Sequence, residues 1–397
     1  MNLSFLNNYY FQRFREWIPR IRGNEYPIDI VNMPFQSSFS LPGLQPGVDD
    51  EASRLIGVPV VKTPFEDNNH FNYTIFMPRK KKKHSSAILL MHGLNEKNWK
   101  KYFPWAHTLT ENLGRPVILF PMAYHINRAP GDWSQPRQMQ VLSQWRLSHK
   151  ADLHESSFIN AALSYRMSSF PQQFSISGYQ SALDIVSLME EIRTGRHPYF
   201  TEDAHIDIFA YSIGAFLAQI LLIANPGDLF SRPDVFLFCG GSAFADMNGS
   251  SRLIMDSQAF EKLYNFYTRE LQDELERNPD YASLLNGTRL GIAFQSMLGE
   301  NSHKGIREEV FDQLTPRVKT IALAKDRVIP ADKIAQTLKG IDGHRPMDVQ
   351  ILDFPYDYCH ENPFPSGKDA DAEAVNRSFL EVFGAASTFL GRSNGRC

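Results

Sequence analysis

Short, fully apolar runs alternate with longer segments of helical periodicity along most of the chain. The runs occupy residues 87–91, 117–120, 206–211, 234–239, 318–324 and 349–354. Continuous apolar runs are typical of strands that helices cover on both faces, as in a parallel sheet. Between the runs, the periodicity predicts helices at about residues 98–113, 176–193, 213–224, 331–339 and 370–390. This alternation predicts an α/β protein with a doubly wound, mostly parallel sheet.

The remaining segments depart from the alternation. Residues 58–61 (VPVV) and 71–77 (FNYTIFM) precede the first run and predict an antiparallel entry to the sheet. Residues 1–57 are aromatic and rich in proline, so we interpret them as an N-terminal extension of a main domain at 58–390. The segments 124–175 and 243–304 exceed ordinary loop lengths, which predicts helical lid or cap insertions over a site. Residues 391–397 are interpreted as a flexible C-terminal tail.

Two surface features of the sequence have alternative interpretations. Residues Phe11, Phe14, Trp17, Ile18 and Ile21 share one helix face. Packing of this face on the main domain is favoured over a helix that lies on a membrane surface. The basic run RKKKKH at residues 79–84 lies between two predicted strands, so a solvated loop is favoured over a patch for anionic surfaces.

Composition bounds the class of protein. The 397 residues are 43% hydrophobic, which is enough for one large domain. The formal net charge of −3 gives no reason to expect a nucleic acid as partner. No apolar run approaches the roughly 18 residues of a transmembrane helix, and the N-terminus lacks the apolar core of a signal peptide. Three cysteines without metal-site spacing suit a reducing compartment, so we expect a cytoplasmic location. Composition does not indicate an oligomeric state.

Two serines are candidates for a nucleophile elbow, in which a strand ends, the chain turns sharply at a serine, and a helix begins. The stretch GRSNG at residues 391–395 matches the letters G-x-S-x-G, but no helix follows Ser393. The stretch AYSIG at residues 210–214 lies between a predicted strand and a predicted helix, and small residues stand two positions before and after Ser212. Ser212 is therefore the candidate nucleophile. The alternative is a serine that only caps a buried helix.

Other chemistry follows the carboxyl ends of further strands, where sites form in parallel α/β sheets. MHGLNE follows the first run, AKDRVIP places Asp326 after a late strand, and DYCHENPF places His360 after the last. Serine, aspartate and histidine then occur in the chain order of a hydrolase triad. The backbone N–H groups of Leu94 and Ile213 stand where this architecture has its oxyanion hole. Asp353 and Asp357 are alternatives to Asp326, and Cys239 and Cys359 are interpreted as structural.

The chain resembles the α/β-hydrolase superfamily over about residues 58–390. The resemblance rests on the four motifs MHGLNE, AYSIG, AKDRVIP and DYCHENPF. The resemblance implies Ser212 as nucleophile, His360 as general base and Asp326 as the acid that orients the histidine. Ala210 replaces the usual first glycine of the elbow, which the superfamily tolerates. The segment 243–304 falls where the superfamily often inserts a cap.

The sequence therefore predicts a serine hydrolase acting on an ester, thioester or amide, with a carboxylesterase or lipase-like enzyme as the leading interpretation. The alternatives are a peptidase, an acyltransferase, or a non-catalytic binding protein on the same fold. We expect a small acyl substrate, and the candidate pocket residues are His92, Asn95, Tyr211 and His125. No metal-site, Walker or dinucleotide pattern is found, so neither metal nor cofactor is expected.

Overall fold

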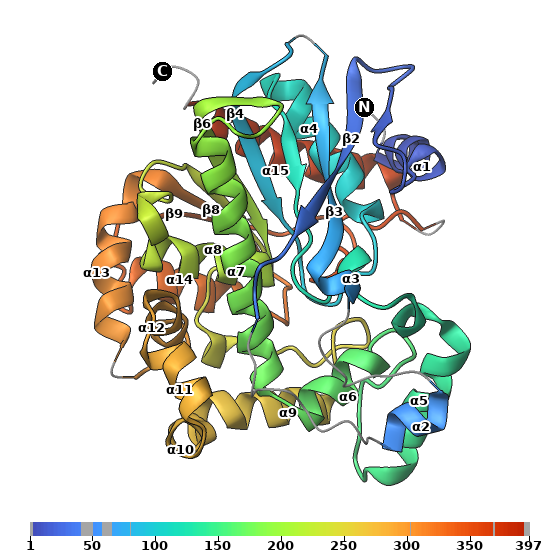
Figure 1. Ribbon diagram of the computed structural model, residues 1–397, viewed down its shortest axis with the longest axis vertical. Helices are drawn as coiled ribbons and strands as arrows, with labels where there is room; N and C mark the ends of the chain where they lie inside the picture. The colour runs from blue at the N-terminus through green and yellow to red at the C-terminus, as the bar shows by residue number, and fades with distance from the viewer. Residues whose placement is uncertain are drawn as a thin grey trace.

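The central feature of the computed structural model is a twisted sheet (Figure 1). The structure describes residues 3–40, 51–57, 66–79, 81–301, 303–367 and 370–392. Within these residues one sheet has the strand order β1-β2-β3-β5-β4-β6-β7-β8-β9. The strands are β1 (Arg20–Ile21), β2 (Ile28–Gln36), β3 (His70–Pro78), β4 (His84–Met91), β5 (Val117–Leu119), β6 (Phe200–Tyr211), β7 (Val235–Phe238), β8 (Val318–Leu323) and β9 (Asp348–Leu352).

Pairing along the sheet changes from antiparallel to parallel. The strands β1, β2, β3 and β5 pair antiparallel to one another, whereas β5, β4, β6, β7, β8 and β9 run parallel. The carboxyl ends of the parallel strands therefore meet at one edge of the sheet, where loops can bring side chains together. This topology, with an antiparallel entry and a crossover at β5 and β4, is the α/β-hydrolase fold, as the strand and helix alternation predicts.

Helices cover both faces of the sheet because the strands are apolar on both sides. Helices α1 (Leu3–Arg13), α4 (Phe103–Leu113) and α15 (Ala372–Leu390) pack on one face. Helices α7 (Gln172–Arg193), α8 (Ile213–Ala224) and α14 (Ala331–Lys339) pack on the other. The bounds predicted for α8 and α14 are confirmed, and those of α4, α7 and α15 lie within a few residues. Among the described helices, none is long and apolar enough to cross a membrane.

The first 57 residues differ from the expectation of an extension. Strand β2 pairs with β3 along its whole length, from Ile28 opposite Pro78 to Gln36 opposite His70. Helix α1 contributes buried residues to the core, and the predicted entry strand at 58–61 lies outside the described residues. The antiparallel entry to the sheet is thus formed by β2 and β3. Phe11 and Trp17 remain exposed, whereas Phe14 and Ile21 pack against the core.

The two long insertions form a helical layer beyond the carboxyl ends of the strands (Figure 1). The first contains α5 (Pro136–His149) and α6 (Ala161–Ser169). The second contains α9 (Ser257–Asn265), the π-helical turn η6 (Phe266–Glu270), α10 (Leu271–Arg277), α11 (Pro279–Asn286) and α12 (Arg289–Ser296). Arg146 on α5 pairs with Asp256 before α9 at 2.6 Å, and Asp256 N–H donates to Ser164 Oγ at 2.9 Å. The insertions are therefore tied to one another by buried polar contacts.

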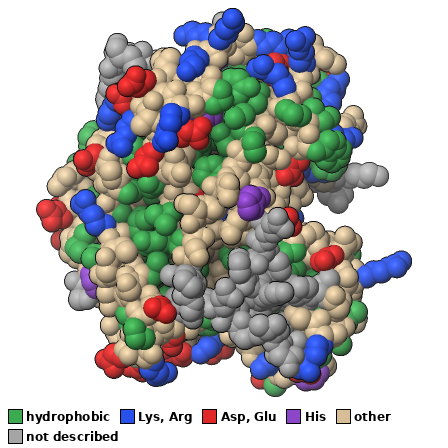
Figure 2. Space-filling model, viewed as in Figure 1, with side chains coloured by type: hydrophobic (Ala, Val, Ile, Leu, Met, Phe, Trp, Pro, Cys, Tyr) green, Lys and Arg blue, Asp and Glu red, His purple; other side chains and the backbone are tan. Residues whose placement is uncertain are grey.

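Basic side chains gather at the opposite end of the molecule. Lys81, Lys82 and Lys83 are exposed in the loop between β3 and β4. Figure 2 shows Lys and Arg side chains along the top edge of the view. This edge lies at the amino ends of the parallel strands, away from the edge that holds the candidate site.

Candidate active site

The turn between β6 and α8 has the backbone of a nucleophile elbow. Ser212 has φ 58° and ψ −124°, a region that non-glycine residues enter at a cost and that is typical of this turn. A Cβ atom on Gly214 would stand 2.7 Å from the carbonyl oxygens of both Met91 and His92. Glycine is therefore required where α8 passes β4, whereas Ala210 is fully buried within the sheet and its methyl group is accommodated.

Ser212, His360 and Asp326 lie in one chain of hydrogen bonds. Ser212 Oγ is 2.6 Å from His360 Nε2, and His360 Nδ1 is 2.7 Å from Asp326 Oδ2. All three residues are at least 95% buried, so water competes little for these contacts. The other carboxylate oxygen, Asp326 Oδ1, accepts the backbone N–H groups of Val328 and Ile329 at 2.9 Å each. The carboxylate is thus held in a fixed orientation toward the imidazole.

Tyr211 supports the histidine from behind. Its hydroxyl donates to the carbonyl oxygen of His360, and its ring stacks on the imidazole at a centroid distance of 5.6 Å and an angle of 19°. The side chain is buried and does not line the cavities described below. Tyr211 therefore lies against His360, outside the candidate pocket in which the sequence analysis placed it.

The alternative acids and thiols do not contact this chain of hydrogen bonds. Asp353 pairs with Lys325 Nζ at 3.0 Å and accepts the Tyr358 hydroxyl at 3.0 Å. Asp357 is exposed. Cys239 is fully buried, which raises the pKa of its thiol well above the usual value, and Cys359 is exposed.

The loop after β4 brings Leu94 next to the elbow. In the described residues, the backbone N–H groups of Leu94 and Ile213 have no hydrogen-bond acceptor. Both side chains line the cavity that contains Ser212. The two N–H groups are thus available to an oxygen atom of a ligand beside the serine.

His92 and Asn95 hold this loop in place. His92 Nε2 accepts the N–H of Met122 at 2.9 Å, and its Nδ1–H donates to the carbonyl oxygen of Gly93 at 2.8 Å. Burial lowers the pKa of His92 to about 3, so the ring stays neutral. Asn95 Nδ2 donates to the carbonyl oxygens of Ile159 and Leu253 in the two insertions. Neither His92 nor Asn95 lines a cavity beside Ser212, in contrast to their interpretation as pocket residues.

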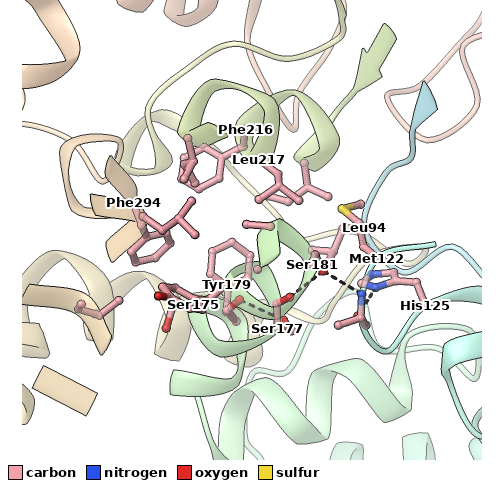
Figure 3. Close-up of a pocket in the computed structure, with 18 residues that line it drawn as sticks. Leu94, Met122, His125, Ser175, Ser177, Tyr179, Ser181, Phe216, Leu217 and Phe294 are labelled. Carbon is pink, nitrogen blue, oxygen red and sulfur yellow. Dashed lines mark hydrogen bonds between the residues drawn. The ribbon is translucent and has the colours of Figure 1, made fainter. Parts of the chain in front are cut away.

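Two adjoining cavities lie beside the elbow. The first contains Ser212 and is lined in part by insertion residues such as Met255 and Phe260. The second is lined mainly by apolar side chains and reaches His125, which is the one candidate pocket residue in the walls of these two cavities (Figure 3). In the close-up, Phe216 and Leu217 lie across the cavity from Ser175, Ser177 and Ser181 of α7. Leu94, Phe174 and Ile213 border both cavities.

The sequence analysis did not single out three side chains near these cavities. Phe174 borders both cavities, and the buried Arg166 and the partly buried Lys97 are cations near His125. Helix α6, which carries Arg166, has no sequence motif that indicates a site. The rings of Tyr124 and Trp133 that lie against Arg166 are distant from it in the sequence. Ser393 of the other serine motif lies outside the described residues.

The chain was compared with known proteins. A family model described as a family of unknown function (DUF6051) matches residues 43–391. The chain belongs to this family. The comparison with curated proteins finds no match for this DUF6051 member.

Several solved structures are similar to it at low identity. A cold-adapted esterase from an Arctic intertidal metagenomic library has 9% identity and a TM-score of 0.39, over 96% of this chain and 99% of that one. A peroxisomal alpha-beta-hydrolase of Saccharomyces cerevisiae has 11% identity and a TM-score of 0.38, over 90% of each chain. An acylaminoacyl peptidase of Pyrococcus horikoshii has 13% identity and a TM-score of 0.39, over 81% of this chain and 40% of that one. The assignment of the fold rests on the strand order and the elbow, because similarities this distant do not carry it.

Proposed function

We propose that this protein is a serine hydrolase that cleaves an acyl ester through a covalent acyl-enzyme. The observation that carries the proposal is the buried hydrogen-bond chain from Ser212 to His360 to Asp326, which begins at a strained elbow. A serine that only caps a helix does not need a histidine 2.6 Å from its hydroxyl, nor a carboxylate behind that histidine.

In the proposed reaction, His360 Nε2 takes the proton of Ser212 as Oγ attacks the carbonyl carbon of the ester. Asp326 holds the Nδ1–H tautomer and stabilises the imidazolium that forms. The N–H groups of Leu94 and Ile213 receive the negative charge on the carbonyl oxygen. The imidazolium then protonates the leaving alcohol. Water, deprotonated by the same histidine, releases the acid from the serine.

The insertions support a role as a cap over this reaction. Met255 and Phe260 form part of the wall of the cavity around Ser212. Apolar walls reduce the amount of water around the reacting carbonyl, which strengthens the electrostatic stabilisation of the oxyanion. An ester with an apolar part near the carbonyl fits these walls better than a long, fully solvated peptide, so an esterase activity is favoured over a peptidase activity.

Labelling with a fluorophosphonate probe tests the proposal. We expect wild type to be labelled, Ser212→Ala to lose the label, and Ser393→Ala to keep it. Hydrolysis of short acyl esters should fall by roughly 10⁶ in Ser212→Ala, because the serine and histidine act as one unit. Circular dichroism of each variant confirms that it is folded. Folded wild type that neither reacts with small fluorophosphonates nor hydrolyses any ester would refute the proposal.

A further inference from the structure

One buried arginine differs from all the others in the described part of the chain. Five buried arginines each lie within 4 Å of a carboxylate: Arg115 with Asp207, Arg128 with Asp184, Arg146 with Asp256, Arg307 with Glu308, and Arg345 with Glu308. Arg166 on α6 is only 4% exposed, yet it has no carboxylate within this distance among the described residues. Buried charges are normally paired, so the exception calls for a physical account.

Two aromatic rings surround Arg166, and no described residue accepts a hydrogen bond from its guanidinium. Its guanidinium carbon lies 4.6 Å from the ring centroid of Tyr124 and 4.2 Å from that of Trp133. A guanidinium that lies over aromatic rings can keep its N–H donors, which lie in its own plane, free for an anion. The guanidinium donates no hydrogen bond to another described residue. The guanidinium of an arginine is a planar fork that suits a carboxylate or a phosphate.

A second cation lies beside it. The N–H of Ile126 donates to the carbonyl oxygen of Glu96 at 3.0 Å, so the end of the β4 loop runs alongside the β5 loop that carries Tyr124. Lys97 follows Glu96 and is partly buried there. Burial, reinforced by the charge of Arg166, lowers the pKa of Lys97 to about 8. Lys97 forms no ion pair with a described residue, and the carboxylate of neighbouring Glu96 is bound by Tyr102 and Lys101.

His125 connects the two cations to the cavities. Its Nδ1–H donates to the carbonyl oxygen of Ala123 at 2.8 Å, and its buried Nε2 has no partner among the described residues. His125 lines the second cavity together with Leu94 and Ile213, which also border the cavity of Ser212 (Figure 3). Lys97 and Arg166 both act electrostatically on His125, which is the member of this group that lines the second cavity. Lys97, Arg166 and His125 are called the cationic corner below, and Lys97 stands three residues along the chain from Leu94.

We propose that Lys97 and Arg166, next to His125, bind an anionic oxygen group, a carboxylate or a phosphate, carried by the ester that Ser212 attacks. The inference rests on the proposed function and names the substrate class as esters with a second, anionic end. A buried arginine and a partly buried lysine that have no carboxylate partner among the described residues are costly for the free protein, and an anionic ligand would offset this cost. One edge of Arg166 can hold two oxygens of the anion, while Lys97 adds a point charge.

Binding is measured first in the Ser212→Ala variant, so that hydrolysis plays no part. Calorimetry compares glutarate, inorganic phosphate and the neutral analogue glutaramide at matched ionic strength. We expect glutarate or phosphate, but not glutaramide, to bind, and whichever of the two binds identifies the anionic group. Adding Arg166→Met or Lys97→Met should weaken binding by roughly tenfold or more, as expected for hydrogen bonds to a charged group. Lys100→Met, which removes an exposed cation of the same segment, should leave affinity unchanged.

Absence of binding by both anions, or equal binding in Arg166→Met, Lys97→Met and their parent, would overturn the inference. If Arg166→Met does not fold, Arg166→Lys replaces it. Lysine keeps the charge but loses the planar fork, so intermediate binding supports the proposal and unchanged binding contradicts it.

Kinetics then separate this inference from the proposed function. Monomethyl esters of dicarboxylic acids from succinate to suberate are compared with neutral methyl esters of the same length. We expect at least one anionic ester to be preferred in kcat/KM by roughly tenfold or more, with the preference lost through KM in Arg166→Met. Hydrolysis of neutral and anionic esters with equal efficiency would reject the anion site and leave the hydrolase intact. Anion binding without hydrolysis of any ester would reject the hydrolase and leave the anion site.

Discussion

Two groups of buried polar side chains lie on either side of the loop after β4, and they differ in how completely the protein satisfies them. In the first group, Ser212, His360 and Asp326 are joined by hydrogen bonds of 2.6 and 2.7 Å, and both oxygens of Asp326 are bound. In the second, Arg166 has no anion and His125 Nε2 has no partner among the described residues.

The first group is suited to catalysis and the second to binding of a ligand. A network that is complete without a ligand keeps its geometry, which is what an attacking group needs. A group of charges that is incomplete without a ligand lowers the stability of the free protein and gains most when the ligand binds. The four predictions below test each side of this contrast.

The largest effect is expected from Asp326→Asn. Asparagine fills the same space, but its amide can donate to His360 Nδ1 and favour the tautomer that cannot accept the serine proton. We expect kcat for ester hydrolysis to fall by roughly 10⁴, with little change in KM. Steady-state kinetics on one short ester measure it.

Asp353→Asn is the matched control, because Asp353 is an exposed aspartate after the last strand that pairs with Lys325. Its kcat should stay within about twofold of wild type, since exposed ion pairs contribute little. A loss of activity in Asp353→Asn and not in Asp326→Asn would reverse the assignment of the acid.

The next largest effect concerns stability and compares two arginines of one insertion. Arg146 and Arg166 are both nearly fully buried, but only Arg146 has a carboxylate, Asp256, at 2.6 Å. Arg146→Met leaves that carboxylate buried without its partner, so the free energy of unfolding should fall by about 3–5 kcal/mol. Arg166→Met removes a charge that has no carboxylate partner among the described residues, so it should leave stability unchanged or raise it. Urea denaturation measures both, and equal losses would show that Arg166 is a structural residue.

Sequence patterns could place the site because its elements are local. Strands β4 and β6 end in apolar runs that polar motifs follow, and the elbow requires small residues at fixed positions around Ser212. His92 shows the limit of this reasoning. The sequence identifies a histidine after a strand, but only the fold shows that Met122 N–H occupies its Nε2 and removes it from the pocket.

Strand β2 and the cationic corner were beyond sequence patterns for different reasons. Pro34 and Asn32 make β2 resemble a loop, since proline breaks the hydrogen-bond ladder of central strands. Pro34 is tolerated because the second neighbour of β2 is the short strand β1. Strand β1 pairs only with Ile30 and Val31, so it does not reach Pro34. The importance of Arg166 lies in the absence of a carboxylate nearby, which depends on how distant segments pack.

A smaller effect is expected from acid. Burial lowers the pKa of His92 to about 3, whereas the unfolded value is about 6.5. Below pH 6.5, His92 is therefore protonated in the unfolded chain but stays neutral in the folded chain. The free energy of unfolding falls as the pH is lowered through this range. His92→Gln can keep the contact with Met122 N–H but does not titrate. Between pH 7.5 and pH 5, the free energy of unfolding should fall by roughly 2 kcal/mol less in His92→Gln than in wild type.

Chemical denaturation at the two pH values measures this difference. His149→Gln, an exposed histidine on α5, serves as the control and should follow wild type. The same acid dependence in His92→Gln and wild type would assign the effect to the other buried histidines, such as His107 and His197, whose pKa values burial lowers to about 4.

The smallest effect is expected from alkali on anion binding. Burial beside Arg166 lowers the pKa of Lys97 to about 8, and Glu96, which opposes this shift, and His125 are the other titratable groups nearby. Above pH 8 the free protein loses this charge, so the affinity of the Ser212→Ala variant for glutarate should fall severalfold between pH 7 and 9. The bound anion favours the charged amine, so binding at pH 8.5 should take up part of a proton. Calorimetry in buffers of different ionisation enthalpy measures that uptake, and Lys97→Met should abolish it. Uptake that persists in Lys97→Met would place the proton on His125 instead.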